Sequence, residues 1–189
     1  MTSKVQIISN AFINLGKGPI TDLSTGNSIK SATIQVYDQL YLSVLQRRPW
    51  SFALTTQSLV QVASPDAIPG YTYAFQLPTD PLCIFIWGAY PYGTDFIRVG
   101  DYLYTNSSTL QILYTTNVDE SLWDPAFVTY FIDALTSKIA YLITQETTIS
   151  EEWNKKAEIS RAYASSSDSR MQPNLPILDN KIYNAHFIG

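Results

Sequence analysis

The amino-acid sequence predicts an α+β fold in which helices and strands are separated along the chain. Apolar residues recur at helical spacing up to residue 50, alternate at a spacing of two through the middle of the chain, and return to helical spacing from residue 124. This order predicts a helical lobe packed with a central antiparallel β-sheet lobe. We expect N-terminal helices over residues 1–50, the sheet lobe over 51–122, C-terminal helices that complete the helical lobe over 123–170, and an extended C-terminal arm over 171–189.

The composition indicates a soluble chain with a sizeable core. The chain has 189 residues, 46% of them apolar, which suffices for one ordinary domain or for two small lobes. Its single cysteine, Cys83, excludes an intrachain disulfide and a thiolate metal site, and it favours a reducing cytoplasm. Polar residues interrupt the apolar N-terminal stretch, so we expect neither a signal peptide nor a membrane span there.

Two helices that form a hairpin are expected in the N-terminal part. The first has Ser3 placed as its N-cap and Gly16 as its C-terminal stop. The apolar stripe of the second is formed by Ile29, Ala32, Val36, Leu40 and Val44. Pro49 must end this helix, because proline lacks a backbone N–H and clashes with the preceding turn.

The middle of the chain predicts an antiparallel sheet. A first run, residues 52–62, places alternate residues on one face. Further short runs that favour strands are YTYAF, CIFIW, FIRV, YLYT and TLQILYT. Gly100 and Asp101 lie between two of these runs, where a two-residue hairpin turn needs a permissive backbone.

Two more helices are expected after the sheet. Asp124 is placed as the N-cap of the first, and Pro125 as its first residue. Thr148 and Glu151 have the spacing of a capping box at the start of the last helix. The inner stripe of that helix is formed by Trp153, Ala157, Ser160 and Ala164. We expect the serine run at residues 165–167 to fray its end.

No residue pattern is typical of an enzyme, and we expect no catalytic residue, metal or cofactor. The single histidine, His186, lies in a proline-interrupted segment near the C-terminus, which is a poor place for a catalytic base. Cys83 lies in an apolar run, where a free thiol usually acts as a small buried hydrophobe. Asp119, Glu120 and Asp124 precede a helix, where acids are favoured by its dipole. A hydrolase whose site the pattern does not reveal is kept as an alternative.

Charge is unevenly distributed along the chain. The net charge is −4, and residues 51–124 contain one basic residue, Arg98, against seven acids. Such a block is a poor surface for DNA phosphates and could instead repel DNA. The thirteen tyrosines fit either large contact surfaces or a tyrosine-rich sheet core.

Several stretches, taken in order, are similar to a known family. They are INLGKGPITDL, LQRRPWSFAL, YAFQLPTDPL, FIRVGDYLYTN, ILYTTNVDESLWDPAF and the alanine-containing last helix. From Ile8 to Arg170 the chain resembles the tail tubular protein A family, the head-to-tail adaptor or gatekeeper ring proteins of short-tailed bacteriophages. The most specific element is Arg-Arg-Pro-Trp-x-Phe-Ala, followed by Leu-Pro-x-Asp and then Gly-Asp-Tyr-Leu-Tyr-Thr. The last nineteen residues carry no signature of the family.

The resemblance implies a structural protein of the virion rather than an enzyme. It implies a homo-oligomeric ring, a dodecamer, that is made in the host cytoplasm and lies at the head–tail interface. The ring joins the portal protein to the tail nozzle, tail tubular protein B, and double-stranded DNA passes through it without sequence-specific binding. No membrane partner is implied. The alternative function is a small non-viral interaction module, such as a chaperone or an inhibitor.

The resemblance also implies structural roles for residues at the end of the second helix and in the sheet. Trp50 and Phe52, which follow Pro49, anchor the junction between the lobes on the family pattern. Pro78 and Asp80 shape a turn in the sheet. We expect Trp50 to bury its ring between the helices and the sheet, the alternative being a surface aromatic.

Two sets of charged residues are candidates for contacts in such a ring. Arg47 and Arg48 end a helix, where they could reach acids on a neighbouring subunit or simply be solvated. Asp95, Asp101 and Asp119 are candidates to line the DNA channel, where negative charge prevents adhesion of DNA. Equally, these acids could keep the sheet surface soluble.

The C-terminal arm is a third candidate for subunit or portal contacts. Its apolar residues are Leu175, Ile177, Leu178, Ile182, Tyr183, Phe187 and Ile188. Pro173 and Pro176 prevent a continuing helix, and the apolar content is unusual for a disordered tail. We expect the arm to dock on the neighbouring subunit or the portal, with docking on its own domain and disorder as alternatives.

Overall fold

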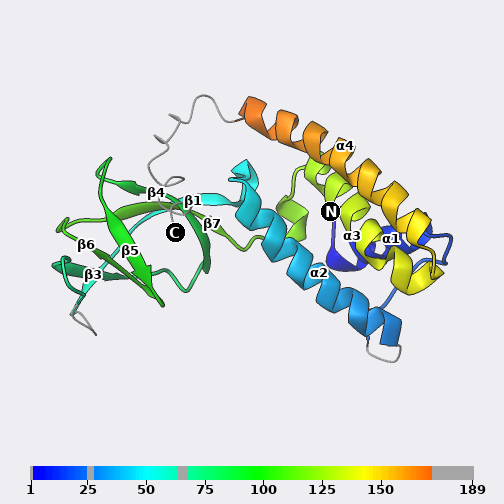
Figure 1. The fold of residues 1–189 in the computed structure, drawn as a ribbon, viewed down its shortest axis with the longest axis horizontal. Coiled ribbons are helices and arrows are strands. Elements are labelled where there is room, and N and C mark those ends of the chain that lie inside the picture. Colours follow the sequence, from blue (N-terminus) through cyan, green and yellow to red (C-terminus); the bar gives the residue numbers. More distant parts are fainter. Residues whose placement is uncertain (1, 25–27, 64–67, 172–189) are drawn as a thin grey trace.

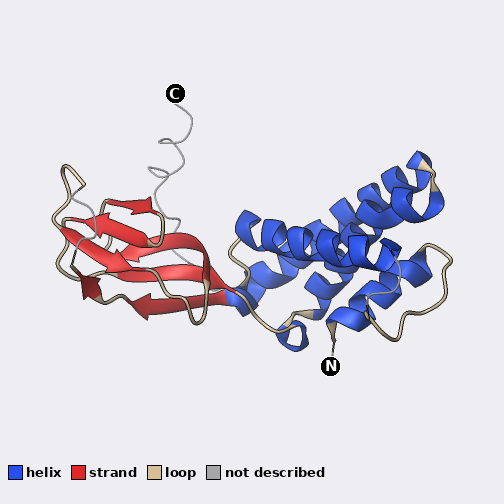
Figure 2. Cartoon of the chain, turned by 90° about the horizontal axis from the view of Figure 1, so that it is seen from below, coloured by secondary structure: helices blue, strands red, loops and turns tan. Residues whose placement is uncertain are grey.

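The structure is a computed structural model that describes residues 2–24, 28–63 and 68–171. It confirms the predicted α+β class, with helices in one lobe and antiparallel strands in the other. The two lobes lie side by side along the long axis of the molecule (Figure 1), and Figure 2 shows the narrow junction where strands meet helices. The predicted arm lies outside the described residues except for Met171.

The helical lobe begins with α1 (Lys4–Asn14) and α2 (Ser28–Arg47), whose ends follow the predicted signals. The Ser3 hydroxyl accepts a hydrogen bond from the backbone N–H of Gln6, and the Gln6 side chain accepts one from Ser3, so α1 starts with a capping box. Gly16 follows α1 with a φ of 72°, which glycine adopts without strain. α2 ends shortly before Pro49, as predicted.

α1 and α2 contact each other, as where Lys4 pairs with Asp38, but neither is the main packing partner of the other, which the predicted hairpin would require. Each of these helices makes more contacts with α3 (Pro125–Thr144) than with the other. α3 is apolar over much of its circumference and becomes the central helix of the lobe. It is long and apolar enough to cross a membrane, but 56% of its most apolar window is buried inside the protein, as in a core helix.

The other lobe contains two antiparallel sheets rather than the single sheet predicted. Its strands in the described residues are β1 (Leu54–Ser58), β2 (Gln61–Val62), β3 (Tyr73–Gln76), β4 (Cys83–Tyr90), β5 (Phe96–Val99), β6 (Tyr102–Thr105) and β7 (Gln111–Thr116). One sheet has the order β1-β7-β4 and the other the order β2-β3-β6-β5. The run predicted over residues 52–62 is divided between them, because β1 pairs with β7 whereas β2 pairs with β3.

The two sheets enclose a second apolar core. Its buried residues are Phe75, Leu77, Cys83, Leu103, Leu110, Ile112 and Tyr114. Val99 pairs with Tyr102, so Gly100 and Asp101 form the predicted two-residue turn, and Gly100 has a φ of 59°.

α3 and α4 (Thr147–Met171) complete the helical lobe. The Asp124 side chain accepts a hydrogen bond from the N–H of Ala126 (2.8 Å), and Pro125 is the first residue of α3, which confirms the predicted start. Both predicted ends of α4 are wrong. The helix begins at Thr147, so Thr148 lies inside it rather than at its N-cap, and it continues through the serine run to Met171.

α4 packs along α3 through small side chains. Ala157 and Ala164 are buried, as the predicted stripe requires. The Lys156 ammonium lies 3.7 Å from the buried carboxylate of Asp133 on α3 and 4.0 Å from the centre of the Trp153 ring. These contacts occupy one side of α4, and much of the rest of the helix is exposed.

Candidate assembly site

The junction between the lobes is built from the residues that follow α2. The N–H of Trp50 donates to the carbonyl of Arg48 (3.0 Å), and residues 51–53 form a short 3-10 helix that leads into β1. The Trp50 side chain is 3% exposed, and its indole N–H donates to the carbonyl of Val44 (3.2 Å). The buried ring therefore has its polar atom satisfied by the end of α2, and the surface alternative is wrong.

Trp50 lies in the core of the helical lobe rather than between the helices and the sheet. Its ring centre is 4.8 Å from that of Phe127 on α3, and the Phe52 ring is 4.7 Å from the same side chain. Trp123 and Phe131 extend this aromatic cluster. The predicted burial is thus confirmed and the predicted position corrected, because α3 brings its aromatic first turns against the end of α2.

A buried carboxylate ties the end of α4 to this junction. Asp168 is 3% exposed and accepts hydrogen bonds from the N–H and the hydroxyl of Ser51 (2.9 and 2.6 Å) and from the guanidinium of Arg48 (3.2 Å). Arg48 also donates to the Ser169 hydroxyl (2.7 Å) and lies 5.3 Å from the centre of the Trp50 ring. A buried charge is tolerated when it is paired and hydrogen-bonded, so these bonds favour one position of α4 relative to the first strand.

Sequence reasoning missed Asp168, although one signal was present. Asp168 follows Ala164 by four residues and so continues the buried stripe along α4. An acid on a buried stripe requires a partner, and it therefore indicates a contact with another part of the chain. The serines around it favour helix ends, which led to the wrong expectation of a frayed terminus.

The two arginines at the end of α2 have different environments. Arg47 is exposed, and its contact with a neighbouring subunit stays a prediction. Arg48 pairs with Asp168 of its own chain, so the expectation that Arg48 reaches an acid on a neighbouring subunit is corrected. The Arg48 side chain instead helps to hold the end of α4 at the junction between the lobes.

Pro78 and Asp80 lie in the connection between β3 and β4, as predicted. Pro78 is buried, and its carbonyl accepts a hydrogen bond from the N–H of Cys83 (3.2 Å). Thr79 and Leu82 form an antiparallel β-bridge that closes the turn around the exposed Asp80. This turn carries the chain from one sheet to the other.

The three acids expected to act together do not form one cluster. Asp95 precedes β5 and Asp101 follows it, so these two lie at opposite ends of the same strand. Asp119 lies between β7 and α3, where its side chain accepts a hydrogen bond from the N–H of Ser121 (2.9 Å). Hydrogen bonding to the Ser121 hydroxyl and, to a smaller extent, to this N–H lowers the pKa of Asp119. All three are exposed, but they belong to different parts of the surface.

Large apolar side chains are exposed on both lobes. On α4, Ile159 and Tyr163 lie one turn apart and are 73% and 70% exposed. On α2, Leu42 is 46% exposed. On β4, Phe85 is 39% exposed, and its ring contacts the half-buried Trp87 with 4.5 Å between ring centres.

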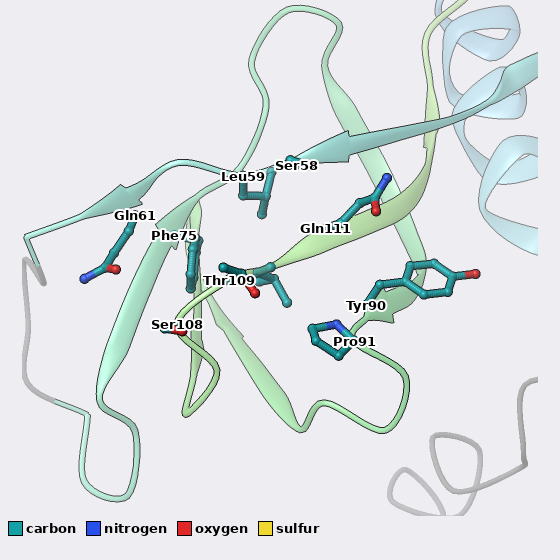
Figure 3. A pocket seen from close by; sticks show the side chains of 10 residues that line it. Ser58, Leu59, Gln61, Phe75, Tyr90, Pro91, Ser108, Thr109 and Gln111 are labelled. Carbon is teal, nitrogen blue, oxygen red and sulfur yellow. The ribbon is translucent and has the colours of Figure 1, made fainter.

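A groove lies at the end of the sheet lobe where β1 and β4 finish and β7 starts (Figure 3). It encloses about 490 Å³. Its lining residues are Ser58, Leu59, Gln61, Phe75, Tyr90, Pro91, Ser108, Thr109, Leu110 and Gln111. This set contains no carboxylate, ammonium, guanidinium or imidazole group, so the groove offers apolar contacts and hydrogen bonds.

Cys83 lies in the sheet core, as predicted. It is 6% exposed, and burial raises the pKa of its thiol to about 11. The thiol therefore stays protonated near neutral pH and is a weak nucleophile. In the described part of the chain, no group of three or more His, Cys, Asp and Glu side chains could hold a metal ion. His186 lies outside the described residues.

The structure defines an α+β protein with a helical lobe, a lobe of two small sheets and apolar side chains exposed on both. No protein-family model matches the chain, and no curated protein matches it.

Proposed function

We propose that the chain is one subunit of a head-to-tail adaptor ring of a short-tailed bacteriophage, and a structural protein of the virion rather than an enzyme. In this proposal the ring is a dodecamer that joins the portal protein to the tail nozzle, with double-stranded DNA passing through its centre. The ordered motifs that resemble tail tubular protein A, from Ile8 to Arg170, support the proposal. The exposed sides of the helical lobe support it independently.

The proposal rests on the observation that two opposite sides of the helical lobe expose apolar side chains. A ring of identical subunits needs two different faces on each subunit, one for each neighbour. α4 and α2 lie on opposite sides of α3 (Figure 1). α4 exposes Ile159 and Tyr163, and α2 exposes Leu42 beside the uncharged Gln39 and Gln46. Because interface cores are depleted in charge and enriched in aromatic side chains, we place α4 of one subunit against α2 of the next.

Ring assembly should depend on the apolar face of α4. Changing Ile159→Ser and Tyr163→Ser together is expected to prevent ring formation, because burial of such side chains at an interface contributes about 1.5–3 kcal/mol each. The measurement is the mass by light scattering and the particle shape by electron microscopy, with the protein alone and mixed with portal particles. The melting temperature should stay unchanged, since both side chains are exposed in the subunit.

Val60→Ser is the matched control for this experiment. Val60 is 76% exposed, as much as Ile159, but lies in the sheet lobe, so this variant should assemble normally. Rings of equal yield from the double variant would contradict the placement of α4 in the contact. A chain that stays monomeric even with portal particles would contradict the adaptor function and favour the small interaction module.

The acids of the sheet lobe are proposed to face the DNA channel. Replacing Asp95 and Asp101 with lysine in assembled particles is expected to slow DNA ejection at low salt, because lysines attract the phosphates that acids repel. Asp119→Lys tests the third acid separately, since it lies apart from the other two. Ejection rates equal to those of the unchanged particle would show that these acids serve solubility.

A further inference from the structure

The outer face of the three-stranded sheet carries a row of apolar side chains. Leu54 on β1 and Phe85 on β4 both pair with Thr115 on β7, so the three residues share a face. Their neighbours in β7, Ile112 and Tyr114, lie in the core between the sheets, so this row lies on the side away from that core. It is the outward side of the sheet.

Two aromatic rings form the exposed part of this face. The indole N–H of Trp87 donates to the Thr115 hydroxyl (2.6 Å), which holds the ring over the sheet. The Phe85 ring lies against it and is 39% exposed, and Trp87 is half-buried. An apolar aromatic pair with its polar atom already satisfied favours an apolar partner.

The end of α4 lies next to this face. Asp168 bonds to Ser51, and Ser51 is three residues before Leu54, which begins the row. α4 ends less than one turn later, at Met171, which is 61% exposed. Figure 1 shows this end of α4 on the side of the molecule where β1 and β4 lie. The chain that follows α4 therefore starts beside the aromatic pair.

The sequence after α4 has the chemistry to cover such a face. Residues 172–189 begin Gln-Pro-Asn-Leu-Pro, in which Pro173 and Pro176 have the spacing that lets polyproline segments dock on aromatic surfaces. Leu175 lies between them. Eighteen extended residues reach roughly 60 Å at about 3.3 Å each, whereas three strands at about 4.8 Å spacing are only about 10 Å wide.

We propose that residues 172–189 dock on the outer face of β1, β7 and β4 of their own chain, with the Pro173–Pro176 segment across Phe85 and Trp87. The sequence alone favoured docking of this segment on a neighbouring subunit or on the portal. The anchored end of α4 reverses that preference, because a segment tethered beside its site has a high effective concentration there. The proposal is independent of ring assembly.

The test is a disulfide between two introduced cysteines in the full chain. Thr56→Cys combined with Asn174→Cys leaves Phe85, Trp87, both prolines and Leu175 in place. Thr56 is exposed and lies two residues after Leu54 on β1, so it is on the same face as the aromatic pair. Treated with oxidised glutathione at low protein concentration, this variant is expected to form a disulfide within one chain. The native thiol of Cys83 should not react with glutathione or with the introduced cysteines, because it is buried and protonated at pH 8. Mass spectrometry of peptides and the mobility of the chain without reductant identify the product.

Ile97→Cys combined with Asn174→Cys is the matched control. Ile97 is exposed, like Thr56, but lies on β5 of the other sheet. The 56–174 pair should close roughly tenfold faster or more, because only that pair is held together by docking. Equal rates for the two pairs, or no internal disulfide, would overturn the proposal. A disulfide between two chains would overturn it in favour of a neighbouring copy.

A second measurement needs no introduced cysteine. Phe85→Ser is expected to accelerate tryptic cleavage after Lys181 in the full chain, because the segment loses its docking surface, whereas Ile97→Ser should leave the rate unchanged. Acceleration by both variants or by neither would contradict the docking on this face.

Discussion

Replacing Trp50 with alanine is expected to lower the free energy of unfolding by about 3–5 kcal/mol, the usual cost of removing a large buried aromatic side chain. The Trp50 ring is 3% exposed, packs on Phe127 and donates its indole N–H to Val44. Its loss would leave a cavity in the aromatic cluster and remove the indole hydrogen bond to the carbonyl of Val44. Urea denaturation followed by circular dichroism measures the change.

Trp153→Ala is the matched control for this substitution. Trp153 is half-buried and contacts the exposed Lys156 rather than an aromatic cluster, so its removal should cost much less. If the two variants unfold at the same urea concentration, the packing role assigned to Trp50 is wrong.

Asp168→Ala is expected to lower the free energy of unfolding by about 2–3 kcal/mol, since hydrogen bonds to charged groups are strong and their loss leaves buried partners unpaired. The substitution removes the acceptor for both groups of Ser51 and for Arg48. Asp168→Asn should cost less, because an amide oxygen can still accept from Ser51. The same denaturation experiment measures both variants.

An exposed ion pair on the same helix is the control for Asp168. Glu158 and Arg161 lie 2.7 Å apart on α4, and both are about half exposed. Removal of Glu158 should change the unfolding free energy by less than about 1 kcal/mol, as is usual for surface pairs. A similarly small effect of Asp168→Ala would show that the buried carboxylate does not hold α4 at the junction.

Much of the fold follows from signals that act over a few residues. Ser3 caps the helix that it precedes, Pro49 stops the helix before it, and Asp124 with Pro125 starts the next long helix. Gly100 allows the two-residue turn between β5 and β6. Each signal acts on backbone groups within one turn of the residue itself, so the neighbouring residues in the sequence are enough to predict the helix end or the turn.

The errors concern features that depend on distant residues. The run over residues 52–62 has the period of one strand, yet it is divided because its first part pairs with β7 and its last two residues pair with β3. The last helix was expected to fray at its serines, yet it continues because the packing of Asp168 outweighs their low propensity. Where the local propensity of a segment and its tertiary contacts favour different structures, the segment adopts the one with the lower total free energy.

The candidate assembly residues show the same division. The burial of Trp50 follows from its type and from the proline before it, but its position in the helical core depends on Phe127, which comes after the sheet. Asp95, Asp101 and Asp119 appear as one acidic block in the sequence, yet the fold separates them. Sequence distance along a chain that changes sheets and lobes is a poor guide to distance in space.

The sequence by itself determined the α+β class, the helices with clear caps and the strands with a period of two, because these follow from backbone hydrogen bonding and from the burial of one face. Only the tertiary structure decided that Arg48 serves its own chain, that α3 is the central helix, and that α4 ends beside an aromatic sheet face. Arg48 and Asp168 are 120 residues apart, and Ser51 and Asp168 are 117 apart. Such pairs are brought together by packing of whole elements, which no local signal specifies.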